Sequence, residues 1–197
     1  MSRADRDKWD QRYREGAYAG RRHPSALLAE RIGDFPLGNA LDVACGAGRN
    51  ALFLAGRGYH VDAIDISAEA LNRAREEAQA LGVSVNWQQH DLDEPLGLEN
   101  EYQLVLLIRY VDLQLLQQLG SLLAPGGILL CEEHLESSED VIGPSSAAFR
   151  VRPGDLQRAA TGLDILYLEE GLVTEPDGRL ASLARLVARK PTLLNNL

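Results

Sequence analysis

Two acidic residues flank a glycine-rich turn in the stretch LDVACGAGRNALFLAGRGYHVDAIDIS, residues 41–67. Gly46 and Gly48 lack a Cβ, so the backbone there can adopt positive φ values and a ligand can approach the main chain closely. The helix expected after the turn offers unpaired N–H groups at its start. Asp65 ends the next apolar run, where an acid accepts hydrogen bonds from the ribose hydroxyls of an adenosine-containing ligand. This spacing predicts a cofactor site.

Asp42 distinguishes between two kinds of adenosine-containing cofactor. A dinucleotide site prefers the pattern GxGxxG, but this chain has Asn50 and Ala51 where the third glycine would fall. A carboxylate beside a pyrophosphate would repel it. Asp42 instead suits a ligand that carries a cation, such as the amino group of a methionyl moiety. The pattern therefore disfavours the alternative of an NAD-dependent oxidoreductase.

The elements that must position these residues alternate along the chain from Pro24 onward. Helical patterns cover residues 25–33, 48–58, 67–82, 113–127 and 154–162. Strand patterns cover residues 39–44, 60–66, 84–89, 102–110, 128–135, 164–173 and 180–190. Strands separated by helices predict parallel pairing with right-handed crossovers. The last two strands, joined by a tight turn, predict a hairpin that adds an antiparallel strand at one edge.

These patterns predict an α/β fold with a doubly wound, mostly parallel, seven-stranded Rossmann-like sheet and an antiparallel C-terminal hairpin strand. Residues 1–22 differ in kind, because they are charged and aromatic and carry hinge-like glycines. We expect residues 1–22 to form an N-terminal lid segment, and residues 23–197 to form the cofactor-binding domain. Trp9 and Tyr13 would seal the site, and Arg21 would lie near a methionyl carboxylate.

The composition excludes several other classes of protein. With 197 residues and a net charge of −9, the chain lacks the basic footprint of a nucleic-acid-binding protein. No apolar run approaches the ~18 residues of a membrane span, and the first ten residues lack the apolar core of a signal peptide. Cys45 and Cys131 are the only cysteines and form no metal-binding motif. We expect a cytoplasmic protein without a metal site that acts on a small molecule, not on nucleic acid or a membrane; its oligomeric state is left open.

The chain resembles the class I S-adenosylmethionine-dependent methyltransferases over about residues 24–190. DVACGAG is similar to their first motif, with Ala44 in place of the first glycine, and Asp65 matches the ribose-binding acid. HDL at residues 90–92 and LLAPGGILL at residues 122–130 resemble two later motifs. Three stretches look most like the tellurite-resistance and thiopurine methyltransferase branch of this class. They are CGAGRNALFLAGRGYHVDAIDIS, FRVRPGDLQRAATGLDILYLEEGLV and RLASLARLVARK.

The resemblance, together with the lid hypothesis, implies S-adenosyl-L-methionine as the cofactor and a set of residues that hold it. This set is Trp9, Tyr13, Arg21, Asp42, Ala44, Cys45, Gly46, Gly48, Asn50, Asp65, Ile66, Asp91, Leu92 and Arg109. Cys45 contributes its backbone and not a nucleophilic thiol.

Arg109 and His134 are candidate catalytic residues because they follow strands at the edge of the sheet where acceptors bind in this fold. The resemblance to the branch implies Arg179 as a third, because it has a counterpart in the terminal hairpin. The expected enzyme is a methyltransferase for a small acceptor such as a thiol or a chalcogen oxyanion. The branch has a His-containing stretch where this chain has LVTEPDGR, which speaks against tellurite itself. The alternative is a catalytically silent, cofactor-binding regulatory module.

Overall fold

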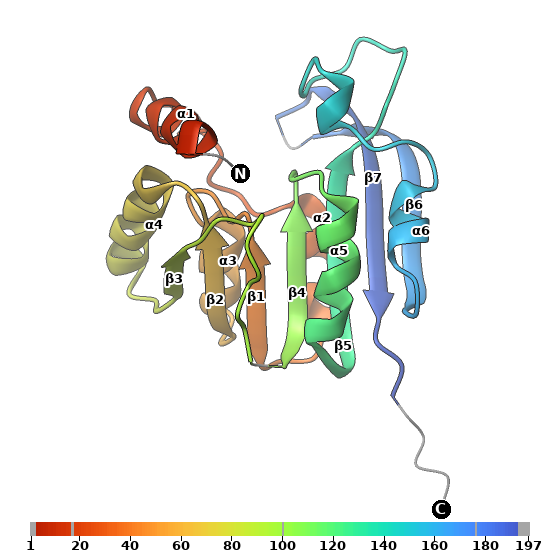
Figure 1. The fold of residues 1–197 in the computed structure, drawn as a ribbon, viewed down its shortest axis with the longest axis horizontal. Coiled ribbons are helices and arrows are strands. Elements are labelled where there is room, and N and C mark those ends of the chain that lie inside the picture. The colour runs from red at the N-terminus through yellow and green to blue at the C-terminus, as the bar shows by residue number, and fades with distance from the viewer. Residues whose placement is uncertain (1–2, 17, 100, 176, 193–197) are drawn as a thin grey trace, which may run out of the picture.

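The computed structural model describes residues 3–16, 18–99, 101–175 and 177–192, and a single seven-stranded sheet lies at its centre (Figure 1). The strands are β1 (Asn39–Val43), β2 (His60–Asp65), β3 (Asn86–Gln89), β4 (Tyr102–Ile108), β5 (Leu123–His134), β6 (Asp164–Thr174) and β7 (Leu180–Arg189). Their order is β3-β2-β1-β4-β5-β7-β6. The pairs from β3 to β5 are parallel, whereas β7 runs antiparallel to β5 and β6. The predicted doubly wound, mostly parallel, Rossmann-like sheet is confirmed.

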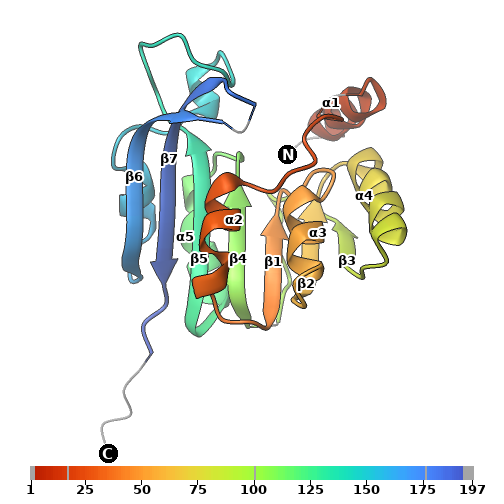
Figure 2. The same cartoon turned by 180° about the vertical axis from the view of Figure 1, so that it is seen from behind.

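Helices cover both faces of this sheet and enclose two apolar cores (Figures 1 and 2). One core contains side chains of α2 (Ala26–Arg31), α3 (Arg49–Ala55) and α4 (Ala68–Leu81), and the other those of α5 (Leu113–Leu119) and α6 (Asp155–Ala159). Short 3-10 turns lie at Ile32–Asp34, Gly120–Leu122 and Ala147–Phe149. Strand β4 is apolar from Leu104 to Ile108 because Leu104 and Leu106 face the first core, while Val105 and Leu107 face the second.

Helix α4 forms where the sequence predicts it, with both ends determined by local chemistry. Ser67 caps it by accepting a hydrogen bond from the Ala70 N–H at 3.1 Å, and Gly82 ends it with a left-handed φ of 67°. Ala70, Leu71, Ala74 and Ala78 are buried along one stripe, as predicted. Leu81 is 58% exposed, so its predicted place in that stripe is wrong.

Strand β5 and the terminal hairpin differ in detail from the sequence prediction. The segment LAPGG was expected to end a helix, but it forms the first part of β5, which pairs with β4 from Leu123 onward. The hairpin was expected to add an antiparallel strand at one edge of the sheet, and β7 is that strand. It lies inside, between β5 and β6, so that β6 is the edge strand. β7 is consequently buried at nearly every position from Ala181 to Ala188.

Helix α1 (Arg3–Arg14) packs against α4 and projects beyond the carboxyl ends of the parallel strands (Figure 1). The connection after β5, which includes the turn at Ala147–Phe149, projects beyond the same edge at the other end of the sheet (Figure 1). The edge where α/β proteins bind ligands thus has additional structure on both sides. Within the described residues, no helix has the length and apolar character that crossing a membrane requires.

Candidate active site

The turn after β1 has the left-handed backbone conformation that its glycines predict. Gly46 and Gly48 have φ values of 55° and 80°, and Ala44 shares this conformation with a φ of 55°. Ala44 stands where the resembling family has its first glycine, and the structure explains that preference, because L-residues other than glycine rarely adopt this φ. The chain keeps the backbone path of the turn despite the substitution.

The two glycines of the turn are required for different reasons. A Cβ on Gly48 would collide with the Trp87 ring, and it would also lie 3.0 Å from the Cβ of Ala74 in α4. Gly48 therefore allows the turn to pack closely under the sheet edge. A Cβ on Gly46 would meet only the Tyr13 hydroxyl of α1. Gly46 is thus the position of this turn that faces the space under the N-terminal helix.

Asp65 lies at the end of β2, beside the glycine turn, as predicted. Its Oδ2 accepts a hydrogen bond from the Gly46 N–H at 2.8 Å, and its Oδ1 accepts one from the Ser67 N–H at 2.8 Å. Burial raises the pKa of Asp65, although these two backbone hydrogen bonds oppose that effect. The carboxylate therefore connects the turn to the start of α4 and is available at the edge where a ribose would lie.

Asp42 is 1% exposed and lies directly before the turn in β1. Its Oδ2 accepts a hydrogen bond from the Ala51 N–H at 3.0 Å, which fixes the first turn of α3. Burial is the largest cause that raises its pKa to about 7, while the Ala51 hydrogen bond acts in the opposite direction. Because the pKa of this buried carboxyl lies near neutrality, a nearby cation would lower that pKa and favour the ionised form.

Cys45 and Asn50, the remaining predicted residues of the turn, are buried and form hydrogen bonds with other parts of the chain. Cys45 is 7% exposed, and its N–H donates to Ile64 O at 3.0 Å; burial raises the pKa of its thiol. Asn50 is 4% exposed, and its Oδ1 accepts a hydrogen bond from the Ser25 N–H at 2.9 Å. Ser25 was expected to cap α2 with its side chain. No such hydrogen bond forms, because Ser25 Oγ donates to Glu132 Oε1 at 3.3 Å instead.

Ile66, Asp91 and Leu92 lie beyond the ends of β2 and β3, next to Asp65. Ile66 and Leu92 are each 6% exposed, and Gln89 Nε2 donates to Ile66 O at 3.0 Å. Asp91 Oδ1 accepts a hydrogen bond from the Asp93 N–H at 3.0 Å, which closes a local turn. The structure therefore brings these three predicted cofactor-binding residues to one corner of the sheet edge.

Helix α1 is attached to the start of α4 by its polar side chains. Asp10 Oδ1 accepts hydrogen bonds from Ser67 Oγ at 2.7 Å and from the Glu69 N–H at 3.2 Å. This position favours an acid, because the N-terminal end of a helix carries a partial positive charge. Arg14 forms an ion pair with Glu69 at 3.1 Å, and Arg73 donates to Tyr13 O. The contacts hold α1 beside the glycine turn.

Tyr13 is 7% exposed, and its hydroxyl points to Gly46. Burial, followed by the charge of Asp65, raises its pKa, so the hydroxyl stays protonated. Trp9 contacts Tyr18, with the ring centroids 6.4 Å apart, and the Arg21 guanidinium lies 5.1 Å from the centroid of Tyr18. Of the two aromatic residues predicted to seal the site, Tyr13 lies over the turn and Trp9 packs on Tyr18.

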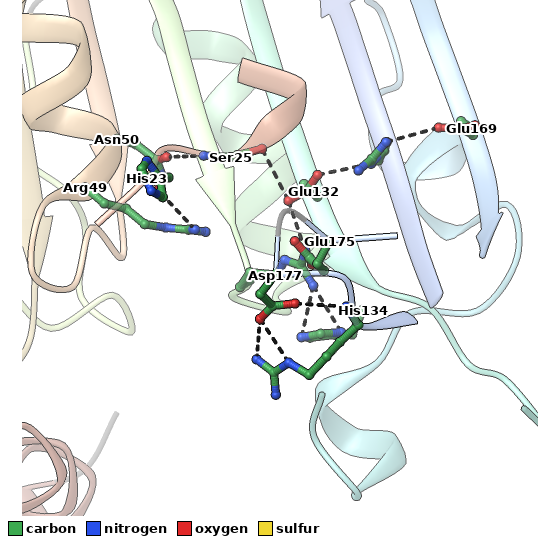
Figure 3. Close-up of polar contacts among 12 residues, drawn as sticks. His23, Ser25, Arg49, Asn50, Glu132, His134, Glu169, Glu175 and Asp177 are labelled. Carbon is green, nitrogen blue, oxygen red and sulfur yellow. Dashed lines mark hydrogen bonds and ion pairs between the residues drawn. The ribbon is translucent and has the colours of Figure 1, made fainter. Parts of the chain in front are cut away.

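At the ends of β4 and β5, the side of the edge where we expect the acceptor, a chain of ion pairs includes the buried Glu132 (Figure 3). Arg109, which follows β4 with a φ of 64°, contacts Glu132 at 3.2 Å and Glu175 at 2.5 Å. Arg185 of β7 contacts the other oxygen of Glu132 at 3.1 Å and Glu169 at 3.4 Å. Glu132 thus lies between two guanidinium groups, from the neighbouring strands on either side of β5.

His134 ends β5 and lies against Arg109, whose Nη1 is 3.1 Å from both ring nitrogens. Burial is the main cause that lowers the pKa of His134 to about 3, and the charges of Arg109, Arg150 and Arg21 lower it further. His134 is therefore neutral at physiological pH. Arg179 is exposed and forms its ion pair with Asp177 at 2.6 Å, on the turn between β6 and β7. The structure brings Arg109 and His134 together, whereas Arg179 is engaged with its own turn.

Sequence reasoning missed the buried charged residues of β5 and β7 that lie around Arg109. Glu132, Glu133 and Arg185 are 2%, 2% and 7% exposed, and none of them was predicted as a site residue. The signal was present in the strand sequence CEEH, because two adjacent acids inside an apolar strand have to be paired or protonated. Glu133 Oε1 accepts from the Tyr110 N–H at 3.0 Å, and burial raises the pKa of Glu133.

Comparisons with known proteins bear on the class of this chain, and the first are matches in sequence. Residues 40–127 match a model of the family described as "Methyltransferase domain". Over 97 residues the chain is 35% identical to the tRNA 5-carboxymethoxyuridine methyltransferase of Escherichia coli K12; the match covers 45% of the chain and 37% of that relative. The chain therefore spans well under half the length of this curated relative.

Two solved structures illustrate the likeness in fold. TehB from Haemophilus influenzae has a TM-score of 0.71 at 18% identity, over 88% of this chain and 66% of TehB. The N-methyltransferase NodS from Bradyrhizobium japonicum, in complex with S-adenosyl-L-homocysteine, has a TM-score of 0.71 at 15% identity, over 94% and 98% of the two chains. The match of residues 40–127 to a methyltransferase domain and the shared fold agree with the predicted class, the class I S-adenosylmethionine-dependent methyltransferases.

Proposed function

We propose that the chain transfers the methyl group of S-adenosyl-L-methionine to a small-molecule acceptor. The observation that carries this proposal is the convergence of the left-handed turn, Asp42 and Asp65 at the carboxyl edge of β1 and β2. When bound, the cofactor supplies an activated methyl group. Asp65 would hold the ribose hydroxyls, Asp42 would face the amino group, and Gly46 would allow close approach to the main chain.

The contribution of the chain to the reaction is alignment and exclusion of water. The acceptor atom has to be held at a near-attack distance of ~3–3.5 Å from the methyl carbon. Tyr13 and the rest of α1 would exclude competing water from the turn. Neutral His134 beside Arg109 could accept a hydrogen bond from the acceptor without carrying charge of its own.

A thiol or a chalcogen oxyanion is the acceptor class that we propose. Such soft nucleophiles need little help from a general base once they are ionised. A nucleic-acid acceptor is conceivable for the class, since the Escherichia coli relative is named as a tRNA methyltransferase. The net charge of −9 argues for a small molecule, because RNA recognition relies on a basic surface that neutralises phosphates.

The cofactor site is tested by removing the acid that would hold the ribose. Asp65→Ala leaves the two hydroxyls poorly paired, so we expect it to weaken S-adenosyl-L-homocysteine binding by roughly 1.5–3 kcal/mol, about one to two decades in Kd. Calorimetry on the folded variant measures this, with Asp62→Ala in the same strand as the control. NADH serves as the negative ligand. Equal affinity of Asp65→Ala and the parent protein would refute the site.

Activity is tested by a screen that reads out S-adenosyl-L-homocysteine release from thiols, selenite, tellurite and common metabolites. Release in the presence of one acceptor separates the enzyme from the alternative of a silent regulatory module. A protein that binds the cofactor tightly but methylates nothing in a broad screen, RNA included, would favour the silent module.

A further inference from the structure

The two carboxylates that contact Arg109 differ sharply in their surroundings (Figure 3). The Glu132 side chain is 2% exposed, and Arg185 holds its second oxygen from the opposite side at 3.1 Å. The Glu175 side chain is 22% exposed and belongs to the segment between β6 and β7. Its only ion pair among the described residues is the one with Arg109, at 2.5 Å. Glu132 is therefore a fixed partner, and Glu175 is a replaceable one.

Arg109 retains capacity for a further hydrogen bond. Its Nε is buried and has no hydrogen-bond partner among the described residues. Leaving such a donor unpaired is unfavourable by roughly 1–3 kcal/mol, more for a charged group. The left-handed backbone of Arg109, a conformation rare for this residue type, aims the side chain toward β5 and the Glu175 segment. The guanidinium is held in a fixed orientation with an unused donor.

Two further arginines, Arg49 and Arg21, lie near Arg109, although the whole protein is acidic. Arg49 Nη1 donates to the backbone oxygen of His23 at 3.3 Å, and no ion pair of Arg49 or Arg21 occurs within the described part of the chain. Burial lowers the pKa of Arg49, followed by repulsion from Arg109 and Arg21. Figure 3 shows Arg49 reaching from the start of α3 to the side on which Glu132 and His134 lie. A free anion in this region would be attracted.

We propose that Glu175 is a built-in counter-ion at the acceptor side, and that an acceptor with an anionic group binds to Arg109 by displacing its carboxylate. The proposal rests on the proposed function, because it assigns the charge of the acceptor at the same site. Glu175 would determine specificity in two ways. It keeps Arg109 neutralised in the free enzyme, and it disfavours uncharged acceptors, which cannot replace the ion pair that they disrupt.

The test compares Glu175→Gln with Asp177→Asn. Both remove one negative charge from the same segment, but Asp177 pairs with Arg179 and not with Arg109. The protein is saturated with S-adenosyl-L-homocysteine, so that the subsite for the methionyl carboxylate is already filled. Two anions, 4-(methylthio)benzoate and selenite, are titrated by calorimetry, together with the uncharged 4-(methylthio)benzamide. The methylthio compounds resemble the product of a thiol acceptor and carry no ionisable thiol.

We expect Glu175→Gln to bind at least one anion about fivefold more tightly than the parent protein, since it removes a competing, partly exposed ion pair. Asp177→Asn should bind the anion as the parent does. The affinity for the benzamide should increase less in Glu175→Gln than that for the anion, because an uncharged ligand forms no ion pair with the vacated Arg109. The proposal is overturned if neither anion binds, if Glu175→Gln shows no gain, or if the benzamide gains equally. Failure of S-adenosyl-L-homocysteine itself to bind would instead refute the proposed function.

Discussion

At the scale of single residues, Asp42 combines burial with a proposed function that depends on its charge. A carboxyl that is 1% exposed and has one backbone hydrogen bond is costly to ionise, which explains a pKa of about 7. An amino group of a bound cofactor would favour the charged form and lower this pKa. The free protein would then hold more protons near pH 7 than the complex, so cofactor binding would release protons.

We therefore expect S-adenosyl-L-homocysteine to bind more tightly as the pH rises from about 6 to about 8, with release of up to about half a proton by Asp42 near pH 7. Calorimetry in buffers of different ionisation enthalpy measures the release. Asp42→Asn keeps the acceptor for the Ala51 N–H but cannot titrate, so it should lack this part of the release. If Asp42→Asn and the parent protein release protons equally, Asp42 does not face the amino group.

Residues that belong to a sequence motif could be predicted, whereas residues that pair between strands distant in the sequence could not. The glycine turn and Asp65 could be found because their spacing in the chain reflects their spacing in the fold. Glu132 and Arg185 lie 53 residues apart in sequence and meet only because β7 inserts beside β5. Their partnership depends on the strand order, which local patterns do not determine.

At the scale of elements, the turn after β1 shows how a local conformation can persist without its preferred residue. Ala44 adopts a left-handed φ of 55° because its neighbours fix the path of the chain: the Cys45 N–H donates to Ile64 O, and the Gly46 N–H donates to Asp65. A left-handed conformation costs a residue with a Cβ roughly 1–2 kcal/mol. The turn therefore contains strain that a glycine would remove.

We expect Ala44→Gly to leave the free energy of unfolding unchanged or to raise it by up to about 1 kcal/mol, because relief of strain offsets the greater entropy of the unfolded chain. Ala47→Gly in the same turn is the matched control, since Ala47 has an ordinary negative φ. It should lower stability by about 0.5–1 kcal/mol. Urea denaturation of the two variants measures both, and an equal loss in both would show that Ala44 is unstrained.

Most elements could be predicted because their hydrophobic period is regular, and the exceptions have identifiable physical causes. LLAPGG reads as the end of a helix because proline and glycine often follow one. In the structure Gly126 has a φ of 79°, and its N–H donates to Lys190 O, so pairing with the last strand overrides the local signal. Likewise, nothing in the hairpin sequence indicates which of its two strands is inserted into the sheet.

At the scale of the whole molecule, charge is divided along the carboxyl edge of the sheet. Asp10, Asp65 and Asp91 gather near the ends of β2 and β3, where the adenosine would lie, while Arg49 and Arg109 lie on the acceptor side. Helix α1 stands over the first region, and its polar contacts with α4 are few and partly exposed. An element attached in this way can open at low free-energy cost.

The N-terminal segment of residues 1–22 was predicted as a lid, and this stays a prediction that kinetics can test. A lid hinders entry and exit alike, so its loss should change rates more than affinity. We expect deletion of residues 1–20 to leave a cooperatively folded protein, to weaken S-adenosyl-L-homocysteine binding by only about threefold, and to speed its dissociation by about tenfold or more. Asp10→Ala, which removes the contacts with Ser67 and Glu69, should shift the rates in the same direction, whereas Lys8→Ala on the exposed side of α1 should not.

Stopped-flow dissociation, together with thermal unfolding, measures these effects on the three variants. If the truncated protein unfolds, α1 is a structural part of the domain; if it releases the ligand at the parent rate, Tyr13 packs over Gly46 without closing the site.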